Sequence, residues 1–278
     1  MINNMNSNTK RFKERLMAAI LSICIVLSGF AIKIDTEAAS KKTIYVIKSV
    51  KYYKFEEYYK DKSENKKSIK DLKDSDFMYY QKDTYSYNKK GLITVKNMDT
   101  AKTTFKYKGS KLVSDKLGNQ KGKYTYRKGK VSQYKQTYDG NFFLRKYTYD
   151  SKGRLKSYKE TMTNFEGFGS FKYSYNKKNQ VTKFSNKVFG TKKMSYNADG
   201  TLKKLIYNKE IYNYDYEKDS NGNVTVVTRT RKSENETMIT KRVITYKKVS
   251  VPASYVKTIN KQQKYVMGDD KDDFTFMN

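Results

Sequence analysis

The 278-residue sequence contains no histidine and no tryptophan, and it has only one cysteine and one proline. Without histidine, Ser-His and Cys-His catalytic pairs cannot form, and nearly all zinc and transition-metal sites lose their usual ligands. The glycines are spaced along the chain and form no phosphate-cradling loop. We therefore predict no catalytic, cofactor or metal site and expect that the protein is not an enzyme.

One catalytic class stays open, because glycoside hydrolysis needs only two carboxyl groups and their spacing in the sequence is unconstrained. The candidate pairs are Glu56 with Glu57, and Asp150 with Glu160. The competing interpretation gives Asp150 a role in a turn and places the other three carboxylates on a solvated surface. A carboxylate-dependent glycosidase is therefore kept as a third hypothesis, behind two noncatalytic ones.

Residues 1–38 follow the order of a secretory signal peptide. Basic residues between Lys10 and Arg15 precede an apolar run over 16–32, and small residues at Thr36 and Ala38 predict cleavage near Ala38. The alternative is a retained N-terminal membrane anchor, because the run of 17 residues is long for a signal peptide and short for a spanning helix. We predict a secreted or cell-surface protein with no membrane span after signal removal.

The single cysteine, Cys24, lies within this apolar run. Ile23 stands before it, where a lipoprotein signal has a small residue, and this argues against lipidation. A mature chain without cysteine can form no disulfide outside the cell. Packing and strand pairing must then hold the fold together.

A repeated unit occupies most of the remaining chain. Pairs of aromatic residues separated by one residue recur from Tyr87 to Tyr216, with their second members 19 to 26 residues apart. The alternation places both rings on one face of a strand. In several copies an Asn or Asp is followed three residues later by Gly, which is typical of a turn in which the glycine takes a positive φ. The turn-defining positions are Gly91, Asp150, Gly153, Asn179, Gly200 and Gly222.

A second strand follows each turn, because an apolar residue such as Val131 or Val224 usually stands two positions beyond the glycine. A period near 20 residues predicts tandem β-hairpin repeats. We expect an all-β protein in which the hairpins form an extended, twisted antiparallel meander sheet. A closed β-barrel is the alternative.

The segment Tyr147–Leu155 reads Tyr-Thr-Tyr-Asp-Ser-Lys-Gly-Arg-Leu. It resembles the YD repeat of the RHS and wall-associated repeat families, whose motif is Tyr-x-Tyr-Asp-x-x-Gly-Arg-Leu. The other copies are degenerate, and the resemblance covers about Thr84 to Thr228. It implies stacked β-hairpins and no single activity. Full-length RHS proteins end in a Pro-containing core motif followed by a toxin domain, whereas Pro252 precedes only 26 residues here. We therefore expect a short secreted protein built from degenerate YD-like repeats.

Four segments follow from these patterns. Residues 1–38 form the signal peptide, 39–83 an N-terminal strand and charged loop, 84–251 the YD-like hairpin array, and 252–278 a partly disordered C-terminal tail.

The charge predicts the partner. The chain has 59 Lys and Arg against 28 Asp and Glu, a net charge of +31, and such an excess favours an anionic partner. Many lysines alternate with the aromatic residues or lie in the turns, so we expect a regular stack of hairpins to present them as a ladder opposite or beside the tyrosine rings. The lysines expected to bind a polyanion are Lys106, Lys108, Lys123, Lys128, Lys146, Lys172, Lys177 and Lys178.

We expect these lysines to bind an anionic cell-wall polymer or polysaccharide, and nucleic acid only nonspecifically. The alternative is a structural or interbacterial interaction protein whose charge is incidental, because an AT-rich genome also enriches Lys, Asn, Tyr and Ile. The sequence does not indicate an oligomeric state.

The first testable prediction concerns export. If the signal peptide is cleaved, culture supernatant will contain a mature form that begins near Ala39. Intact-mass analysis of the supernatant protein measures this directly. Full-length protein confined to the membrane fraction would support the anchor instead.

Overall fold

The computed structural model describes residues 40–58, 72–232 and 236–267. The predicted signal peptide, with Cys24, lies outside these residues. The chain divides into two compact units. In the first, Met1–Lys41 with Pro252–Ser254, the Ala253 backbone N–H donates to the Ser40 carbonyl at 2.8 Å. The second unit, Lys42–Val251 with Tyr255–Asn278, contains the hairpin array.

The described chain forms sixteen antiparallel strands, which follow one another around the sheet in sequence order. The first eight are β1 (Lys41–Tyr58), β2 (Met78–Tyr87), β3 (Ile93–Asn97), β4 (Lys102–Lys108), β5 (Lys111–Leu117), β6 (Gln120–Arg127), β7 (Lys130–Tyr138) and β8 (Asn141–Tyr149). The second eight are β9 (Leu155–Met162), β10 (Ser170–Tyr175), β11 (Val181–Asn186), β12 (Gly190–Tyr196), β13 (Leu202–Tyr207), β14 (Glu210–Lys218), β15 (Val224–Lys232) and β16 (Glu236–Pro252). Short 3-10 turns, η2 (Asp74–Asp76) and η3 (Ala253–Tyr255), precede β2 and follow β16.

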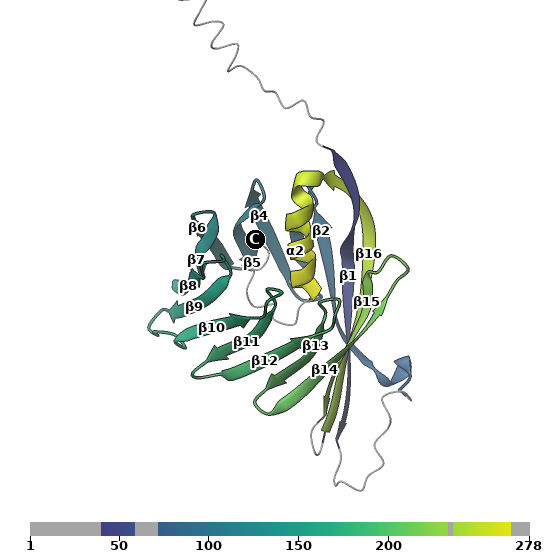
Figure 1. The fold of residues 1–278 in the computed structure, drawn as a ribbon. Helices are drawn as coiled ribbons and strands as arrows, with labels where there is room; N and C mark the ends of the chain where they lie inside the picture. The colour runs from purple at the N-terminus through teal and green to yellow at the C-terminus, as the bar shows by residue number, and fades with distance from the viewer. Residues whose placement is uncertain (1–39, 59–71, 233–235, 268–278) are drawn as a thin grey trace, which may run out of the picture. The chain divides into compact units, whose positions relative to one another are not determined.

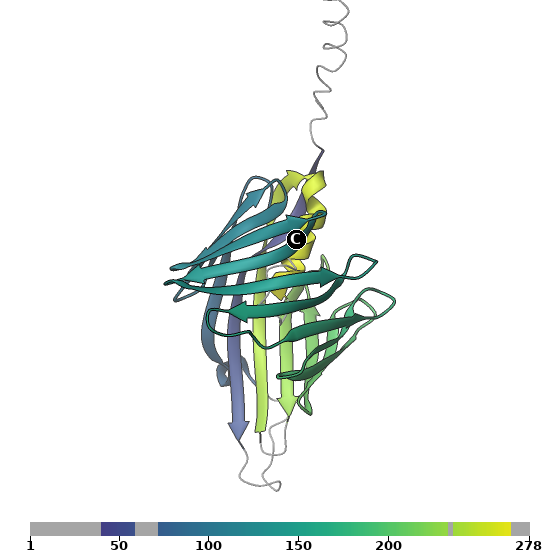
Figure 2. The ribbon, with the colours of Figure 1, turned by 90° about the vertical axis from the view of Figure 1, so that its left-hand side faces the viewer.

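The sheet closes into a barrel because β1 pairs with both β2 and β16 (Figures 1 and 2). Side chains join this seam as well: the Ser49 and Thr245 hydroxyls lie 2.7 Å apart. The all-β class is thus confirmed, and the closed barrel, given above as the alternative, is the observed architecture. The extended meander is wrong. The long terminal strands pair with each other, and closure removes the exposed edges that an open array would present.

The hairpin turns follow one pattern. In the β8–β9 turn, the Asp150 carboxylate accepts the Arg154 backbone N–H at 2.8 Å, and the Asp150 carbonyl accepts the Gly153 N–H at 2.9 Å. Gly153 has φ +78°, and Asn179 adopts φ +60° at the matching position of the β10–β11 turn. The remaining turn-defining glycines also have positive φ: Gly91 (+78°), Gly200 (+88°) and Gly222 (+79°).

Each repeat turns its aromatic rings to one face of the sheet, which we call the inner face. The first ring of most pairs is buried, as at Tyr85, Phe105 and Tyr124, and the second is partly buried. Burying such rings is the main source of stability in a chain without disulfides. The rings therefore line one continuous core around the barrel.

The second tyrosine of a pair also makes a recurring hydrogen bond, except for Tyr107, whose hydroxyl accepts from the Gln262 amide. In the others the hydroxyl donates to a backbone carbonyl of the preceding strand at 2.6 to 2.8 Å. We call this set the tyrosine ladder. It joins Tyr87 to Ile47, Tyr126 to Leu112, Tyr149 to Val131, Tyr175 to Leu155, Tyr196 to Val181, Tyr216 to Leu202 and Tyr246 to Val224.

The register explains why these carbonyls are available. In the strand pairs that carry the ladder, pairing stops early at the end away from the connecting turn. The β7–β8 pairing runs from Tyr138 opposite Asn141, beside the turn, to Gln133 opposite Lys146, two residues short of Val131. The Tyr149 hydroxyl then supplies a donor to the Val131 carbonyl, 2.7 Å away. A buried carbonyl without a donor is costly, so the tyrosine satisfies a group that the splayed hairpins leave unpaired.

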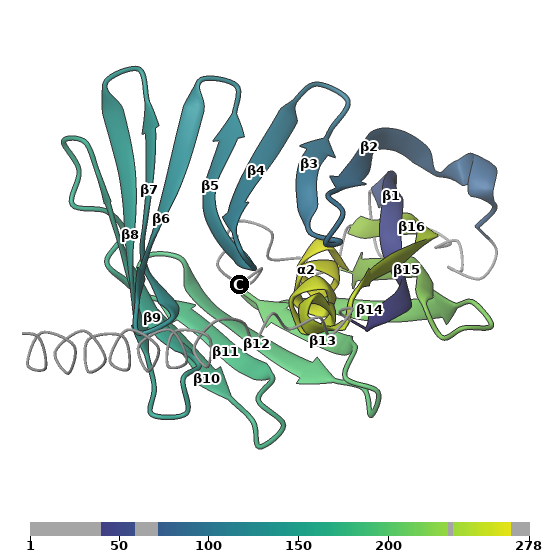
Figure 3. The same ribbon diagram turned by 90° about the horizontal axis from the view of Figure 1, so that it is seen from above.

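A helix, α2 (Val256–Met267), lies inside the ring of strands (Figure 3). Two buried glutamines attach it: Gln263 accepts the Ile47 backbone N–H at 2.7 Å, and Gln262 accepts that of Ile93 at 3.1 Å. Gln262 also donates to the Tyr107 hydroxyl at 3.1 Å. Among the described residues, no helix is long and apolar enough to cross a membrane.

Sequence analysis predicts only a partly disordered tail over 252–278 and misses this helix. The reason is that two of its four buried residues are glutamines, which weaken the apolar 3.6-residue period. The close approach of α2 also constrains the first turn. A Cβ at Gly91 would lie 2.6 Å from Val251 Cγ1 and 2.7 Å from Ile259 Cδ1.

The second testable prediction concerns the tyrosine ladder. Tyr149→Phe removes the donor to the Val131 carbonyl and keeps the ring, so it should lower the free energy of unfolding by about 1 kcal/mol. Tyr207→Phe is the matched control, since Tyr207 lies on β13 outside the ladder; we expect less than about 0.5 kcal/mol there. Urea unfolding followed by circular dichroism measures both. If both variants lowered the free energy of unfolding equally, the hydrogen bonds of the ladder would make no specific contribution to stability.

Candidate polyanion-binding face

The residues that alternate with the inner rings point to the opposite side of the sheet, which we call the outer face. On four alternate strands an exposed lysine stands next to a buried ring. These lysines are Lys106 on β4, Lys123 on β6, Lys146 on β8 and Lys172 on β10. The structure thus places half of the expected lysines on the outer face. Each of them is next to an inward-pointing ring, so its own side chain must point outward.

Strand register shows how these lysines are arranged. One row crosses β4 to β9 through Lys106, Ser114, Lys123, Lys135, Leu144 and Thr161. The row on one side contains Thr104, Lys116, Lys121, Thr137 and Phe142. The row on the other side contains Thr125, Gln133, Lys146, Lys159 and Ser170. We call these three rows, all made of described residues, the lysine rows; none of their positions carries a carboxylate.

Lysines in these rows face one another directly. Lys116 is opposite Lys121, Lys123 is opposite Lys135, and Lys146 is opposite Lys159. Side chains opposite each other on antiparallel strands have Cβ atoms about 5 Å apart, and like charges at that spacing destabilise a sheet. All six are exposed, so water and salt reduce the repulsion without removing it. The outer face therefore concentrates positive charge at a cost to folding.

Sequence reasoning missed four lysines of these rows: Lys116, Lys121, Lys135 and Lys159. The residues beside the aromatic pairs identify one lysine each on β4, β6 and β8. Lys121 was missed because Gly122, and not a ring, follows it on β6, and the other three lie on intervening strands with fewer paired rings. The row that each lysine joins depends on the register between neighbouring strands. One observation in the sequence could have identified Lys135: it follows Tyr134, so the two side chains must point to opposite faces of the strand.

The other expected lysines lie elsewhere. Lys172 stands one row beyond, opposite Ser157 and Ser185. Lys108 ends β4 opposite Lys111, and Lys128 occupies the β6–β7 turn with φ +50°. Two more lie in the β10–β11 turn, Lys177 and Lys178. These positions are exposed, but they line the rim of the hairpins and do not extend the lysine rows.

The inner face holds buried carboxylates that already have partners. Asp115 accepts the Tyr124 hydroxyl at 2.8 Å and the Tyr134 hydroxyl at 3.3 Å. Burial raises the pKa of the Asp115 carboxyl above its ordinary value, and the two tyrosine donors oppose part of that shift. Glu160 pairs with the Arg145 guanidinium at 2.7 Å. These groups satisfy one another within the core.

The structure does not bring together Asp150 and Glu160, the second candidate pair for glycoside hydrolysis. Asp150 lies in the β8–β9 turn, where the Arg154 backbone N–H and guanidinium hold the pKa of its carboxyl below the ordinary value. Glu160 lies on β9, five residues beyond Leu155, where that strand begins. Five residues of strand span roughly 16 Å, well beyond the carboxyl separation of either glycosidase class.

No family model matches this chain, and no curated protein matches it in sequence. Among solved structures, a porin-like protein from Bacteroides uniformis has a TM-score of 0.51 at 12% identity, over 72% of this chain and 98% of that one. This likeness concerns the barrel fold alone. A Tc holotoxin pore from Photorhabdus luminescens has a TM-score of 0.31 at 15% identity, over 56% of this chain and 9% of that one. The complex TcdB2-TccC3-TEV has a TM-score of 0.33 at 11% identity, over 63% and 11%. Both scores are too low to relate the folds.

The third testable prediction concerns the facing lysines. Lys123→Glu places a carboxylate opposite Lys135 and should raise the free energy of unfolding by about 0.2 to 1 kcal/mol at low salt. Lys172→Glu changes the net charge equally but faces two serines, so it controls for the general effect of charge. Urea unfolding at two salt concentrations measures the difference between the variants, which should shrink as salt rises. Indistinguishable variants would contradict the register.

Proposed function

We propose that the protein is a noncatalytic secreted or cell-surface protein that binds an anionic cell-envelope polymer along the lysine rows. The observation that carries this proposal is the direct opposition of Lys116 with Lys121, Lys123 with Lys135, and Lys146 with Lys159. A bound polyanion would offset the repulsion within each pair, because both lysines would be attracted to its negative charges. The unfavourable energy of the facing lysines in the free protein would therefore be relieved on binding.

The size of the lysine rows suits a polymer better than a small ion. Five inter-strand spacings from β4 to β9 span roughly 24 Å, and the three rows cover about 13 Å along the strands. Seven lysines occupy this area: Lys106, Lys116, Lys121, Lys123, Lys135, Lys146 and Lys159. A chain with a negative charge in each unit would contact several of them at once, which favours binding through many weak contacts.

The hypothesis of incidental charge explains the number of lysines but not their arrangement. A bias in codon use enriches lysine at exposed positions of all kinds. It gives no reason for lysines to face each other across three of the four strand interfaces from β5 to β9 while no carboxylate lies in the lysine rows. The hairpins also fit our proposal that the array descends from degenerate YD-like repeats, and the order of residues 1–38 supports export to the envelope.

The fourth testable prediction is retention on purified cell wall. The protein should bind wall that carries phosphodiester polymers at about 50 mM salt and be released by a few hundred millimolar, because each neutralised phosphate releases a counterion. Wall stripped of these polymers should retain little. Cosedimentation measures all three conditions, with single-stranded DNA as a nonspecific competitor.

Paired variants separate the lysine rows from the rest of the charge. Lys123→Gln with Lys135→Gln removes a facing pair from the central row, whereas Lys177→Gln with Lys178→Gln removes the same charge from the β10–β11 turn. The first variant should be released at lower salt than the second. Absence of binding at low salt, or equal binding at about 1 M salt, would overturn the proposed function in favour of incidental charge.

A further inference from the structure

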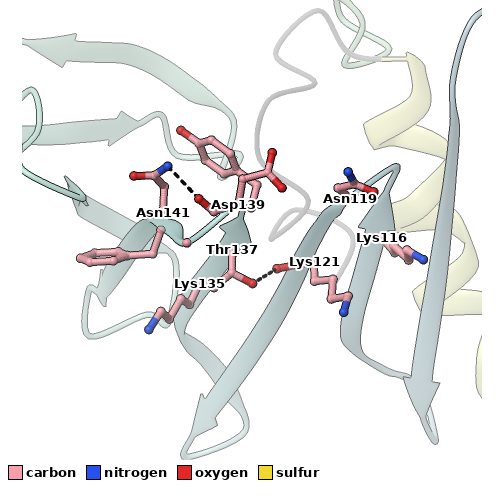
Figure 4. A pocket seen from close by; sticks show the side chains of 10 residues that line it. Lys116, Asn119, Lys121, Lys135, Thr137, Asp139 and Asn141 are labelled. Atoms are coloured by element: carbon pink, nitrogen blue, oxygen red, sulfur yellow. Dashed lines mark hydrogen bonds between the residues drawn. The ribbon is translucent and has the colours of Figure 1, made fainter.

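An open pocket lies at one end of the lysine rows, between the β5–β6 hairpin and the β7–β8 hairpin (Figure 4). Its volume is about 540 Å³, within the range of small-molecule sites. Both turns contribute to it: Asn119 comes from the β5–β6 turn, and Asp139 and Gly140 come from the β7–β8 turn. The pocket is thus built where two neighbouring hairpins splay apart.

Positive charge dominates its lining. Lys116, Lys121 and Lys135 line the pocket, against a single carboxylate, Asp139. The first two lysines are opposite each other on β5 and β6, so the same side of the cavity carries two positive charges. The third, Lys135, has its Nζ 5.1 Å from the centre of the Phe142 ring, a cation–π contact that keeps the ammonium close to the wall. An anionic group is the natural occupant of this side.

The rest of the lining suits hydroxyl groups and a carbon skeleton. Asn119 and Asn141 offer amides and Thr137 a hydroxyl. The Thr137 hydroxyl donates to the Lys121 carbonyl at 3.4 Å and the Asn141 amide to the Asp139 carbonyl at 3.2 Å, which leaves their oxygens to accept from a ligand (Figure 4). The Tyr138 ring is 41% exposed and gives an apolar surface beside them. The lining has lysines and no arginine, so it lacks the planar fork that matches a carboxylate in two bonds, while lysine binds phosphate as a point charge.

We propose that this pocket binds one phosphodiester-linked polyol or sugar unit of the envelope polymer. Its phosphate lies between Lys116 and Lys121, and its hydroxyl groups lie toward Asn119, Asn141 and Thr137. The inference rests on the proposed function and narrows it. The lysine rows attract any polyanion, whereas the pocket selects one whose units carry both a phosphate and free hydroxyls.

The test is isothermal titration of the full chain with poly(glycerol phosphate), with polyglutamate and with single-stranded DNA, at about 50 mM salt. Lys116→Gln with Lys121→Gln should weaken binding of poly(glycerol phosphate) about tenfold or more. Lys183→Gln with Lys193→Gln is the matched control, since these lysines also face each other, on β11 and β12, outside the pocket. That control should weaken binding less than about threefold. Circular dichroism confirms that each variant is folded.

A neutral variant separates hydroxyl recognition from charge. Asn119 is exposed in its turn, so Asn119→Ala leaves the charge unchanged. It should weaken binding of poly(glycerol phosphate) several-fold while leaving polyglutamate binding as it was. Equal losses from both lysine pairs, or no selective loss from Asn119→Ala, would overturn the pocket and leave the proposed function standing. DNA binding that is as tight and as sensitive to the pocket variants would assign the site to nucleic acid. Failure of the unaltered protein to bind poly(glycerol phosphate) and phosphodiester-bearing wall would overturn the proposed function itself.

Discussion

The hydrogen bond from each tyrosine of the ladder to a carbonyl of the preceding strand is the constraint on which the barrel depends. Pairing between those two strands stops two residues before that carbonyl, so the sheet alone cannot satisfy it. The tyrosine hydroxyl does so from the inner face and thereby fixes where each hairpin lies against its neighbour. At Ile93 the helix supplies a different connection: Gln262 accepts the Ile93 N–H, and the Tyr107 hydroxyl accepts from Gln262 instead of donating to a carbonyl. Side-chain hydrogen bonds to the backbone thus join both the strands and the helix into one core.

The outer face follows from this inner arrangement. Two ring positions per strand must point inward for the ladder to form, and the two-residue period of a strand then sends the intervening residues outward. With lysine so frequent at those intervening positions, register alone decides which lysines meet. The pairs of Lys123 with Lys135 and of Lys146 with Lys159 lie across β6–β7 and β8–β9, where short turns join the paired strands and set their register. The pair of Lys116 with Lys121 lies across β5–β6, where the Tyr126 hydroxyl donates to the Leu112 carbonyl. Turns and inner bonds together therefore fix the proposed binding face.

Much of the repeat unit could be predicted from the sequence, because its determinants are local. Asp150 and Gly153 define a turn within four residues, and alternating rings identify the buried face of a strand. Closure could not be predicted, since it pairs β1 with β16 at the far end of the array. Helix α2 was hidden by Gln262 and Gln263, polar residues buried because they satisfy strand backbone groups. To place the lysines of the intervening strands in their rows, one must know which residues pair across neighbouring strands. That register cannot be derived from a single sequence.

The closed ring has a consequence for how such a chain can change in length. An open array of hairpins can gain or lose a unit at either end, because each unit touches only its neighbours. Here the last strand must meet the first, and α2 must reach β1 through Gln263 and β3 through Gln262 at the same time. An inserted hairpin would widen the circumference and pull these anchors apart. Closure therefore fixes the number of hairpins for the whole barrel. The amino-acid sequence of a single hairpin can still change, provided that this number stays the same.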